Sequence, residues 1–194
     1  MYIAQNLGGE LLSIPQLDND NIFDIEDDVV GIVFPVYYAT SPKILREYLK
    51  KVNITTDYLF LIASYGSNGD QNALRIMTKT LEKRGMIVNY TNSVLMVDNY
   101  LPMFDMAKEK KIKDENNIFN AISIIKGDIS MKKEYKLSKK MFTTVPFIEK
   151  VLESTMSKKF KIVVSKDCSN CQICTKVCPR DNIELTEKKT CSRR

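Results

Sequence analysis

The sequence predicts an α/β fold: a doubly wound parallel sheet followed by a small cysteine-bearing segment. Two continuous apolar runs, 29–34 and 58–63, have the length and β-branched content of buried parallel strands. An amphipathic pattern of helical period follows each of them. Strands that alternate with helices require right-handed crossovers, and these give a parallel sheet covered on both faces.

The first residues give weaker signals. Residues 1–7, followed by two glycines, are typical of the last turns of a helix, so the chain is expected to begin inside an element. Residues 11–14 are a short strand candidate, and 15–28 form an acidic connection. The run 29–34 is the first clear strand, and we expect it to be buried on both faces.

Helix starts and stops are clear in the middle of the chain. Ser41 and Pro42 supply an N-cap and a proline at the first helical position. Gly85 and Gly127 each follow a helical pattern that a glycine would end. The elements expected here are a helix from 41 to about 52, a strand at 58–63, a helix at 70–84, a strand at 86–96 and a helix at 114–126.

Loops that carry tyrosine follow the predicted strands, at 35–40, 64–69 and 98–102. Ligands of such sheets bind beyond the carboxyl ends of the strands. A single loop tyrosine often only packs on the surface, but several on one rim favour a planar ligand that stacks on them. The candidate binding residues are Pro35, Val36, Tyr37, Tyr38, Ser64, Tyr65, Gly66, Asp98, Asn99 and Tyr100.

The cysteines all follow residue 167, as Cys168-Ser-Asn-Cys171-Gln-Ile-Cys174-Thr-Lys-Val-Cys178-Pro179 and then Cys191. Thiolates at this spacing hold the corners of an iron–sulfur cluster. A disulfide framework would spread its cysteines over a small secreted domain. Structural zinc usually takes two separated Cys-x-x-Cys pairs or adds histidine, which this chain lacks. Zinc and disulfides stay as alternatives to the iron–sulfur interpretation.

The number of cysteines limits the number of clusters. A [4Fe–4S] cluster takes a set of four thiolates, and 5 cysteines complete at most one. We expect Cys168, Cys171 and Cys174 to hold it, with Cys178 or Cys191 as the fourth ligand. A three-iron cluster on the first three is the alternative. A short loop shields a cluster poorly, so we also expect oxygen lability.

Three domains are expected: 1–127, a basic linker and docking helix at 128–159, and a partial cluster-binding domain at 160–194. The docking helix has its apolar face at 147–152. A strand at 160–164 leads into the cysteine run, and 182–185 is expected to pair with it.

Composition narrows the function classes. The absence of histidine excludes serine–histidine and cysteine–histidine hydrolases. No apolar run is long enough to span a membrane and no secretory segment is recognisable, so we expect a cytoplasmic protein. The net charge of +5 arises mainly from lysines in the second half. Such runs more often form a solvated face than a nucleic-acid groove, and we expect no nucleic-acid partner.

Taken together, Val33-Phe-Pro-Val-Tyr37, the helix opened by Ser41-Pro42, Asp98-Asn99-Tyr100 with Pro102-Met103, and the cysteine run resemble the flavodoxin–ferredoxin fusion proteins of anaerobic bacteria and archaea. This resemblance implies a flavodoxin-like domain that binds FMN and a ferredoxin-like α+β domain with two [4Fe–4S] clusters. It implies electron transfer with redox partner proteins. It also implies that Tyr37, Tyr38 and Tyr65 stack on the isoalloxazine ring.

The chain departs from that family at two places. It has no Thr-Gly-Thr-Gly-Asn-Ser-like loop to hold the FMN phosphate, and no second cysteine run. We therefore expect a chain clipped at both ends, without the first strand that would pair with 29–34 in the order 2-1-3-4-5. Marginal stability and weak or absent FMN binding should result.

Two functions are compatible with these patterns. One is an electron carrier, as opposed to an enzyme that converts a substrate. The other is a non-redox remnant or interaction module that keeps the α/β scaffold and binds no cofactor.

Overall fold

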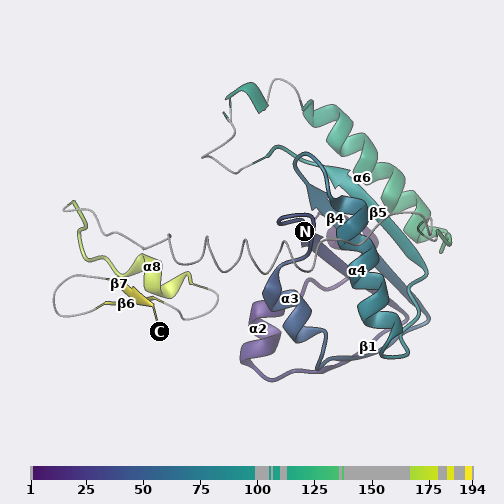
Figure 1. Cartoon of the computed structure of the whole chain (residues 1–194), viewed down its shortest axis with the longest axis horizontal. Coiled ribbons are helices and arrows are strands. Elements are labelled where there is room, and N and C mark those ends of the chain that lie inside the picture. The colour runs from purple at the N-terminus through teal and green to yellow at the C-terminus, as the bar shows by residue number, and fades with distance from the viewer. Residues whose placement is uncertain are drawn as a thin grey trace.

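The computed structural model describes residues 2–98, 105, 107–109, 113–135, 137, 167–178, 183–185 and 191–193. We call residues 2–137 the body and 167–193 the cysteine segment (Figure 1). The elements in chain order are α1 (Tyr2–Leu7), α2 (Ile14–Asn19), β1 (Asp24–Glu26), β2 (Val29–Pro35), α3 (Lys43–Tyr48), β3 (Asn53–Thr55), β4 (Tyr58–Tyr65), α4 (Asp70–Glu82), β5 (Tyr90–Leu95), α6 (Glu115–Ser130), α8 (Ile173–Lys176), β6 (Ile183–Leu185) and β7 (Cys191–Arg193).

An open parallel sheet in the strand order β2-β4-β5 forms the centre of the body. Asp24 lies opposite Asn53 and Val29 opposite Tyr58, so β1 and β3 continue the β2–β4 pairing at the same sequence offset. Helices connect the parallel strands. The predicted α/β class with parallel strands is confirmed.

Helices α2, α3 and α4 cover one face of this sheet (Figure 1). Alternate residues of β4 point to this face, as the two-residue period of a strand requires. The apolar residues at helical spacing in α4 are completely buried, at 0% exposure: Ala73, Leu74, Met77 and Leu81. This core consists mainly of Ile32, Phe34, Leu45, Tyr48, Leu49, Leu59, Leu61, Ala63, Ala73, Leu74, Met77 and Leu81.

Helices α6 and α1 cover the other face. Ile125 and Ile129 of α6 are buried against β4 and β5, and Ile3 and Leu7 of α1 pack beside them. The expectation that helices cover both faces of the sheet is confirmed. The strand residues on this face are Tyr58, Phe60, Ile62, Tyr90 and Val94.

Strand β2 is well buried on one face only, which corrects the expectation of burial on both faces. Ile32 is buried, whereas Val29 and Val33 on the opposite face are 36% and 55% exposed. The ring of Phe60 lies over Gly31, where an added Cβ would collide with it. Among the described residues β2 pairs with β4 alone. In the described part of the chain, helices α6 and α1 pack over β4 and β5 and not over β2. The ring of Phe60 over Gly31 therefore provides part of the cover of β2 on this face.

The strand expected at residues 11–14 does not form. Leu11 and Leu12 are 58% and 46% exposed, and Ile14 already belongs to α2. Pro15 lies in the first turn of that helix, where its fixed φ and missing N–H suit helix initiation. The short apolar run at 11–14 therefore leads into helix α2 and does not form a strand.

Two helix boundaries also differ from their predictions. Ser41 does not cap α3: its hydroxyl is directed at the sulfur of Met77, 2.9 Å away, and the helix begins at Lys43. Gly127 does not end α6, which continues to Ser130. Ile129 is 3% exposed against the sheet. Its burial outweighs the low helix propensity of one glycine, which is about 1 kcal/mol.

The cysteine segment has its own small elements. Strand β6 pairs antiparallel with β7, with Leu185 opposite Cys191. The docking helix expected at 147–152 and the strand expected at 160–164 lie outside the described residues. The expected pairing of 182–185 with 160–164 is therefore not tested. Among the described residues, β6 pairs with β7.

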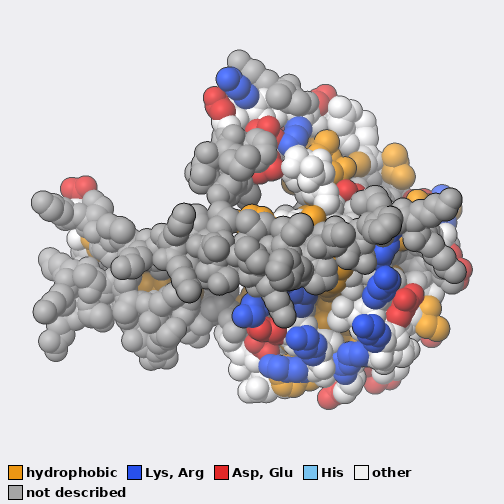
Figure 2. Space-filling model, in the orientation of Figure 1, with side chains coloured by type: hydrophobic (Ala, Val, Ile, Leu, Met, Phe, Trp, Pro, Cys, Tyr) orange, Lys and Arg blue, Asp and Glu red, His pale blue; other side chains and the backbone are white. Residues whose placement is uncertain are grey.

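The surface over α3 and α4 carries many lysine and arginine side chains (Figure 2). Lys43, Lys50, Lys79 and Lys83 are exposed there. Acidic side chains such as Glu47 are exposed on the same helices, so this face carries charges of both signs. Among the described helices, none is long and apolar enough to cross a membrane.

Candidate functional site

The carboxyl ends of β2, β4 and β5 meet at one edge of the sheet. Pro35 lies opposite Ser64, and Ser64 opposite Val94, so the three strands end at nearly the same level. The loops that follow, 36–42, 66–69 and 96–98, therefore share one rim. We call this edge the tyrosine rim.

A tight turn follows β2. The N–H of Tyr37 donates to the carbonyl of Thr40 at 2.8 Å, and the N–H of Thr40 donates back at 3.0 Å. Between them Tyr38 and Ala39 have φ values of 51° and 59°. Such turns favour glycine and asparagine, and each of these two residues stores about 1 kcal/mol or more of strain. The turn leaves the side chains of Tyr37 and Tyr38 52% and 47% exposed.

This turn packs on the start of α4. The amide of Asn72, in the first turn of α4, donates to the carbonyl of Ala39 at 2.8 Å. Gly69 has a φ of 89°, and a Cβ there would come within 2.6 Å of Ala39. Both the backbone conformation and the close approach therefore require glycine at this position.

A second set of contacts joins the loops after β4 and β5. The ammonium of Lys113 donates to the carbonyl of Gly66 and forms an ion pair with Glu109 at 2.5 Å. Glu109 also accepts from the N–H of Asp98 at 3.3 Å. The hydrogen bond from Lys113 lowers the pKa of the Glu109 carboxyl, which therefore stays ionised. The sequence interpretation missed this pair, although glutamate four residues before lysine was a usable signal.

Tyr65 is the last residue of β4 and lies at the tyrosine rim. Burial and the nearby charge of Asp70 raise the pKa of its hydroxyl. Ser93 of β5 donates to Asp70 at 2.6 Å, which links the start of α4 to the sheet. Of the predicted rim residues, Asn99 and Tyr100 lie outside the described residues. The structure places Pro35, Val36, Tyr37, Tyr38, Ser64, Tyr65, Gly66 and Asp98 at the rim.

The cysteine segment has four described thiols that differ in exposure. Cys171 and Cys174 are exposed, and Cys168 and Cys178 are partly buried. The structure has no disulfide among these four cysteines. Cys191 begins β7.

The backbone around Cys171 is sharply turned. Asn170 and Gln172 on either side have φ values of 59° and 62°. The N–H of Ile173 donates to the Cys171 sulfur, and a hydrogen bond with Ser169 adds to it. These hydrogen bonds lower the pKa of the Cys171 thiol, because they favour the thiolate, which is the form that binds metals.

The thiols are the right type of ligand for an iron–sulfur cluster, but the described thiols do not lie close enough together to hold one. Soft thiolate donors with N–H groups directed at sulfur suit such a cluster. However, the described residues contain no group of three or more His, Cys, Asp or Glu side chains placed to hold a metal ion. Cluster binding therefore requires the segment to close around the metal.

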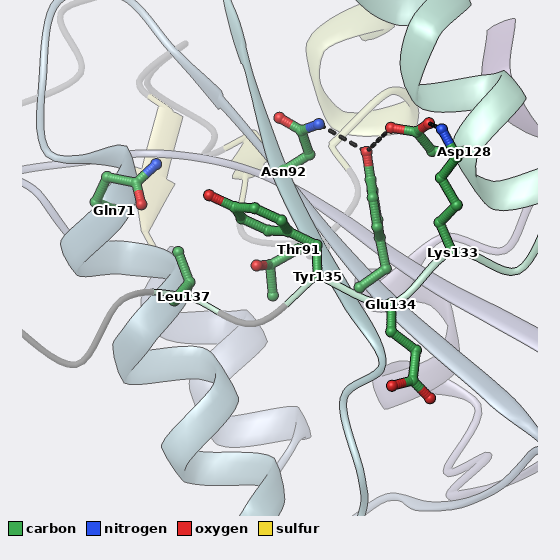
Figure 3. A pocket seen from close by; sticks show the side chains of 9 residues that line it. Gln71, Thr91, Asn92, Asp128, Lys133, Glu134, Tyr135 and Leu137 are labelled. Carbon is green, nitrogen blue, oxygen red and sulfur yellow. Dashed lines mark hydrogen bonds and ion pairs between the residues drawn. The ribbon is translucent and has the colours of Figure 1, made fainter.

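A cavity of about 330 Å³ lies beside the edge strand β5 (Figure 3). Its walls come from α4, the start of β5, the end of α6, residues 133–135 and Leu137. Tyr135 pairs in parallel with Tyr90, and its N–H donates to the carbonyl of Asn89 at 3.0 Å. The segment after α6 thus forms one wall of the cavity.

A hydrogen-bond network lies at this wall (Figure 3). The Tyr90 hydroxyl donates to Asp128 at 3.0 Å and accepts from the Asn92 amide at 2.6 Å. Lys133 pairs with the other oxygen of Asp128 at 2.7 Å. Burial raises the pKa of Tyr90 to about 12, and the hydrogen bond from Lys133 lowers that of Asp128. The sequence interpretation did not single out these residues, because 86–96 was treated only as a strand and Lys133 only as linker.

Comparison of the chain with models of known protein families and with curated proteins gives no match. The tyrosine rim, the cysteine segment and the cavity are therefore interpreted from their own residues.

Proposed function

We propose that this protein transfers electrons through an iron–sulfur cluster held by Cys168, Cys171 and Cys174, with Cys178 or Cys191 as the fourth ligand. The observation that carries the proposal is the cysteine run, with thiols at cluster spacing and a backbone N–H directed at one sulfur. The resemblance to flavodoxin–ferredoxin fusion proteins supports it. Redox proteins are the proposed partners.

The residues around the thiols have a defined task in this proposal. The cluster, when bound, supplies a one-electron redox centre. The N–H of Ile173 and the hydroxyl of Ser169 stabilise the Cys171 thiolate before metal arrives. Hydrogen bonds to sulfur and solvent exposure then set the reduction potential.

The tyrosine rim is the place where we propose that a flavin ring stacks, within a flavodoxin-like arrangement of the body. Exposed rings at Tyr37 and Tyr38 and the nearby Tyr65 suit a planar heterocycle. The sequence has no Thr-Gly-Thr-Gly-Asn-Ser-like loop for the phosphate. FMN is therefore expected to bind weakly or not at all. A fluorescence titration of the full chain with FMN measures this, and stoichiometric tight binding contradicts it.

A second candidate function is an interaction module that binds no cofactor. It is favoured by the finding that the described residues hold no preformed group of metal ligands. The two candidates differ in one measurable property, the iron content of the anoxic protein.

Reconstitution of the full chain with ferrous iron and sulfide under strict anoxia tests the proposal. We expect a coloured protein with about four irons and four sulfides per chain. Cys171→Ala should lose the cluster. Val177→Ala, at a 68% exposed position in the same segment, is the matched control and should keep it.

The outcomes separate the candidates. A colourless protein without iron overturns the redox proposal and leaves the interaction module. Bound zinc in place of iron and sulfide also overturns it. About eight irons per chain would contradict a single cluster.

A further inference from the structure

Strand β2 has one edge that pairs with no strand in the described part of the chain. On its other edge all 7 residues pair with β4. The carbonyl of Asp28, just before β2, accepts from β4 at 3.2 Å, and the N–H of Val36, just after it, donates to β4 at 2.8 Å. Residues that bond to one neighbour alternate along a parallel ladder with residues that face the other side. The N–H groups of Val29, Gly31 and Val33 therefore point to the free edge.

This free edge has few of the features that protect edge strands. Such strands commonly carry a lysine, a proline or a bulge that prevents pairing with another chain. The sequence of β2 is VVGIVFP, without a charged residue. Its one protective residue is Pro35 at the last position, where the ring nitrogen faces the free edge and cannot donate a hydrogen bond. The edge is therefore open to a further strand along residues 29–33.

The side chains along this edge are apolar and exposed. Val29, Gly31 and Val33 lie on one face of the strand, because side chains alternate, and all three positions are exposed. The ring of Phe60, which lies opposite Gly31 in β4, covers that glycine. The edge thus combines main-chain donors and acceptors with exposed apolar side chains, which are the two features that a docking strand requires.

The spacing of these groups is self-complementary about Gly31. Two copies of β2 placed antiparallel, with a two-fold axis at Gly31, bring each Val29 opposite a Val33 of the other copy. About six backbone hydrogen bonds then close the edge, two for each pair of facing residues. The valines cover each other's exposed side chains, and cross-strand pairs of this kind stabilise a sheet. Pro35, which cannot donate, falls just outside this register, opposite Asp27 of the second copy.

The charges around β2 favour this direction of pairing. The segment before the strand carries four exposed acidic residues, Asp24, Glu26, Asp27 and Asp28. Parallel pairing of two copies in register would bring these two segments side by side, where like charges repel. Antiparallel pairing places each segment beside residues 35–37 of the second copy, which carry no charge. An antiparallel second copy therefore fits the edge better than a parallel one.

We propose that two copies of this chain pair through the free edges of β2, as a two-fold dimer with one sheet continuous across both bodies. The sheet order β2-β4-β5 of each copy then becomes β5-β4-β2-β2-β4-β5 across the dimer. A contact along two short strands is a small interface, so we expect a weak dimer with a Kd of about 1–100 µM. The proposal does not depend on the cysteine segment or on electron transfer.

Analytical ultracentrifugation of the full chain, kept reduced and free of metal, tests the dimer between about 1 and 500 µM. The sedimenting species should change from one copy to two copies and no further. Amide hydrogen exchange followed by NMR locates the contact. The amides of Val29, Gly31 and Val33 should exchange at least about tenfold more slowly in the dimer. Those of Val30 and Ile32 already face β4 and should not change.

Opposite charges at position 33 test the register. Val33→Glu and Val33→Lys both replace a 55% exposed valine, but only the glutamate repels the acidic segment of the second copy. We expect the Kd to rise at least about tenfold for Val33→Glu and clearly less for Val33→Lys. Ile87→Glu, at a 72% exposed position outside β2, is the matched control and should keep the Kd within about twofold.

Four results would overturn the proposal. One is a chain that stays monomeric at about 500 µM, or that grows beyond two copies. Another is a dimer in which the three edge amides exchange as in the monomer, because it then pairs through another surface. A third is protection of these amides already in the monomer, which would show that the same chain covers the edge. The fourth is an equal loss for both charges at position 33, which a parallel pair would give. The first three results use the parent chain and do not require the variants to fold.

Discussion

The body and the cysteine segment are ordered by different means. In α4 of the body, Leu74 and Leu81 are completely buried against the sheet. In the cysteine segment, α8 has no buried residue, and Ile173 and Val177 are 60% and 68% exposed. The body is stabilised by its own apolar burial. Helix α8 of the cysteine segment offers thiol donors beside it but no buried residue, so we expect a bound group to stabilise this segment.

Metal loading should give the largest difference between the two regions. If a cluster orders the cysteine segment, amide hydrogen exchange at residues 168–178 should slow by about a hundredfold or more on loading, whereas that of α4 should not change. Exchange mass spectrometry of the anoxic apo and loaded protein measures both. Equal protection of the segment without metal would show that the segment is ordered by its own contacts.

Truncation of one aliphatic side chain in each region should have unequal effects. Leu74→Ala leaves a cavity in the core and should lower the free energy of unfolding by about 2–5 kcal/mol. Ile173→Ala should change it by less than about 0.5 kcal/mol in the apo protein, because the side chain is already in water. Urea unfolding followed by circular dichroism compares them. Similar losses at both sites would contradict the comparison.

Alkaline pH should destabilise the body through Tyr90. Burial raises the pKa of this hydroxyl from 10.0 to about 12 in the folded state, so the folded chain holds the proton more tightly than the unfolded chain. Stability is therefore complete below pH 10 and falls as the pH rises towards 12. The loss should reach roughly 3 kcal/mol, at about 1.4 kcal/mol per pKa unit.

Tyr90→Phe is the control for this pH dependence. It should be less stable than the parent at neutral pH, since Asp128 and Asn92 lose a hydrogen-bond partner. It should also show a shallower decline between pH 10 and 12. An unchanged alkaline slope in this variant would assign the effect to other tyrosines.

The helix caps should give the smallest difference. Asp114 caps α6 by accepting from the N–H of Asn116 at 3.0 Å, whereas Gln172 at the start of α8 makes no such side-chain bond. Asp114→Ala should lower the free energy of unfolding by about 1 kcal/mol. Gln172→Ala should not lower it in this way, because no side-chain cap is lost. Asp114→Asn keeps an accepting oxygen and should retain most of the stability. A loss in Asp114→Asn as large as in the alanine variant would exclude capping as the cause.

Local spacing was enough to predict the main elements of the body. The run 58–63 became the central strand β4, and the inward face of α4 is the one that its helical period predicts. The candidate residues after β2 and β4 lie at one rim because parallel strands end together. The role of the rim and the ligands of the cysteine run stay predictions.

The sequence by itself determined the main strands and helices of the body and which residues carry soft donors, because these properties depend on neighbours a few positions apart. Tertiary structure alone decided the rest. Ile129 carries α6 past Gly127, Phe60 covers Gly31, and Lys113 reaches the carbonyl of Gly66. These contacts join residues that no local period relates. They exist only once packing of the whole body has brought their elements together. The cavity beside β5 likewise forms only when these elements pack.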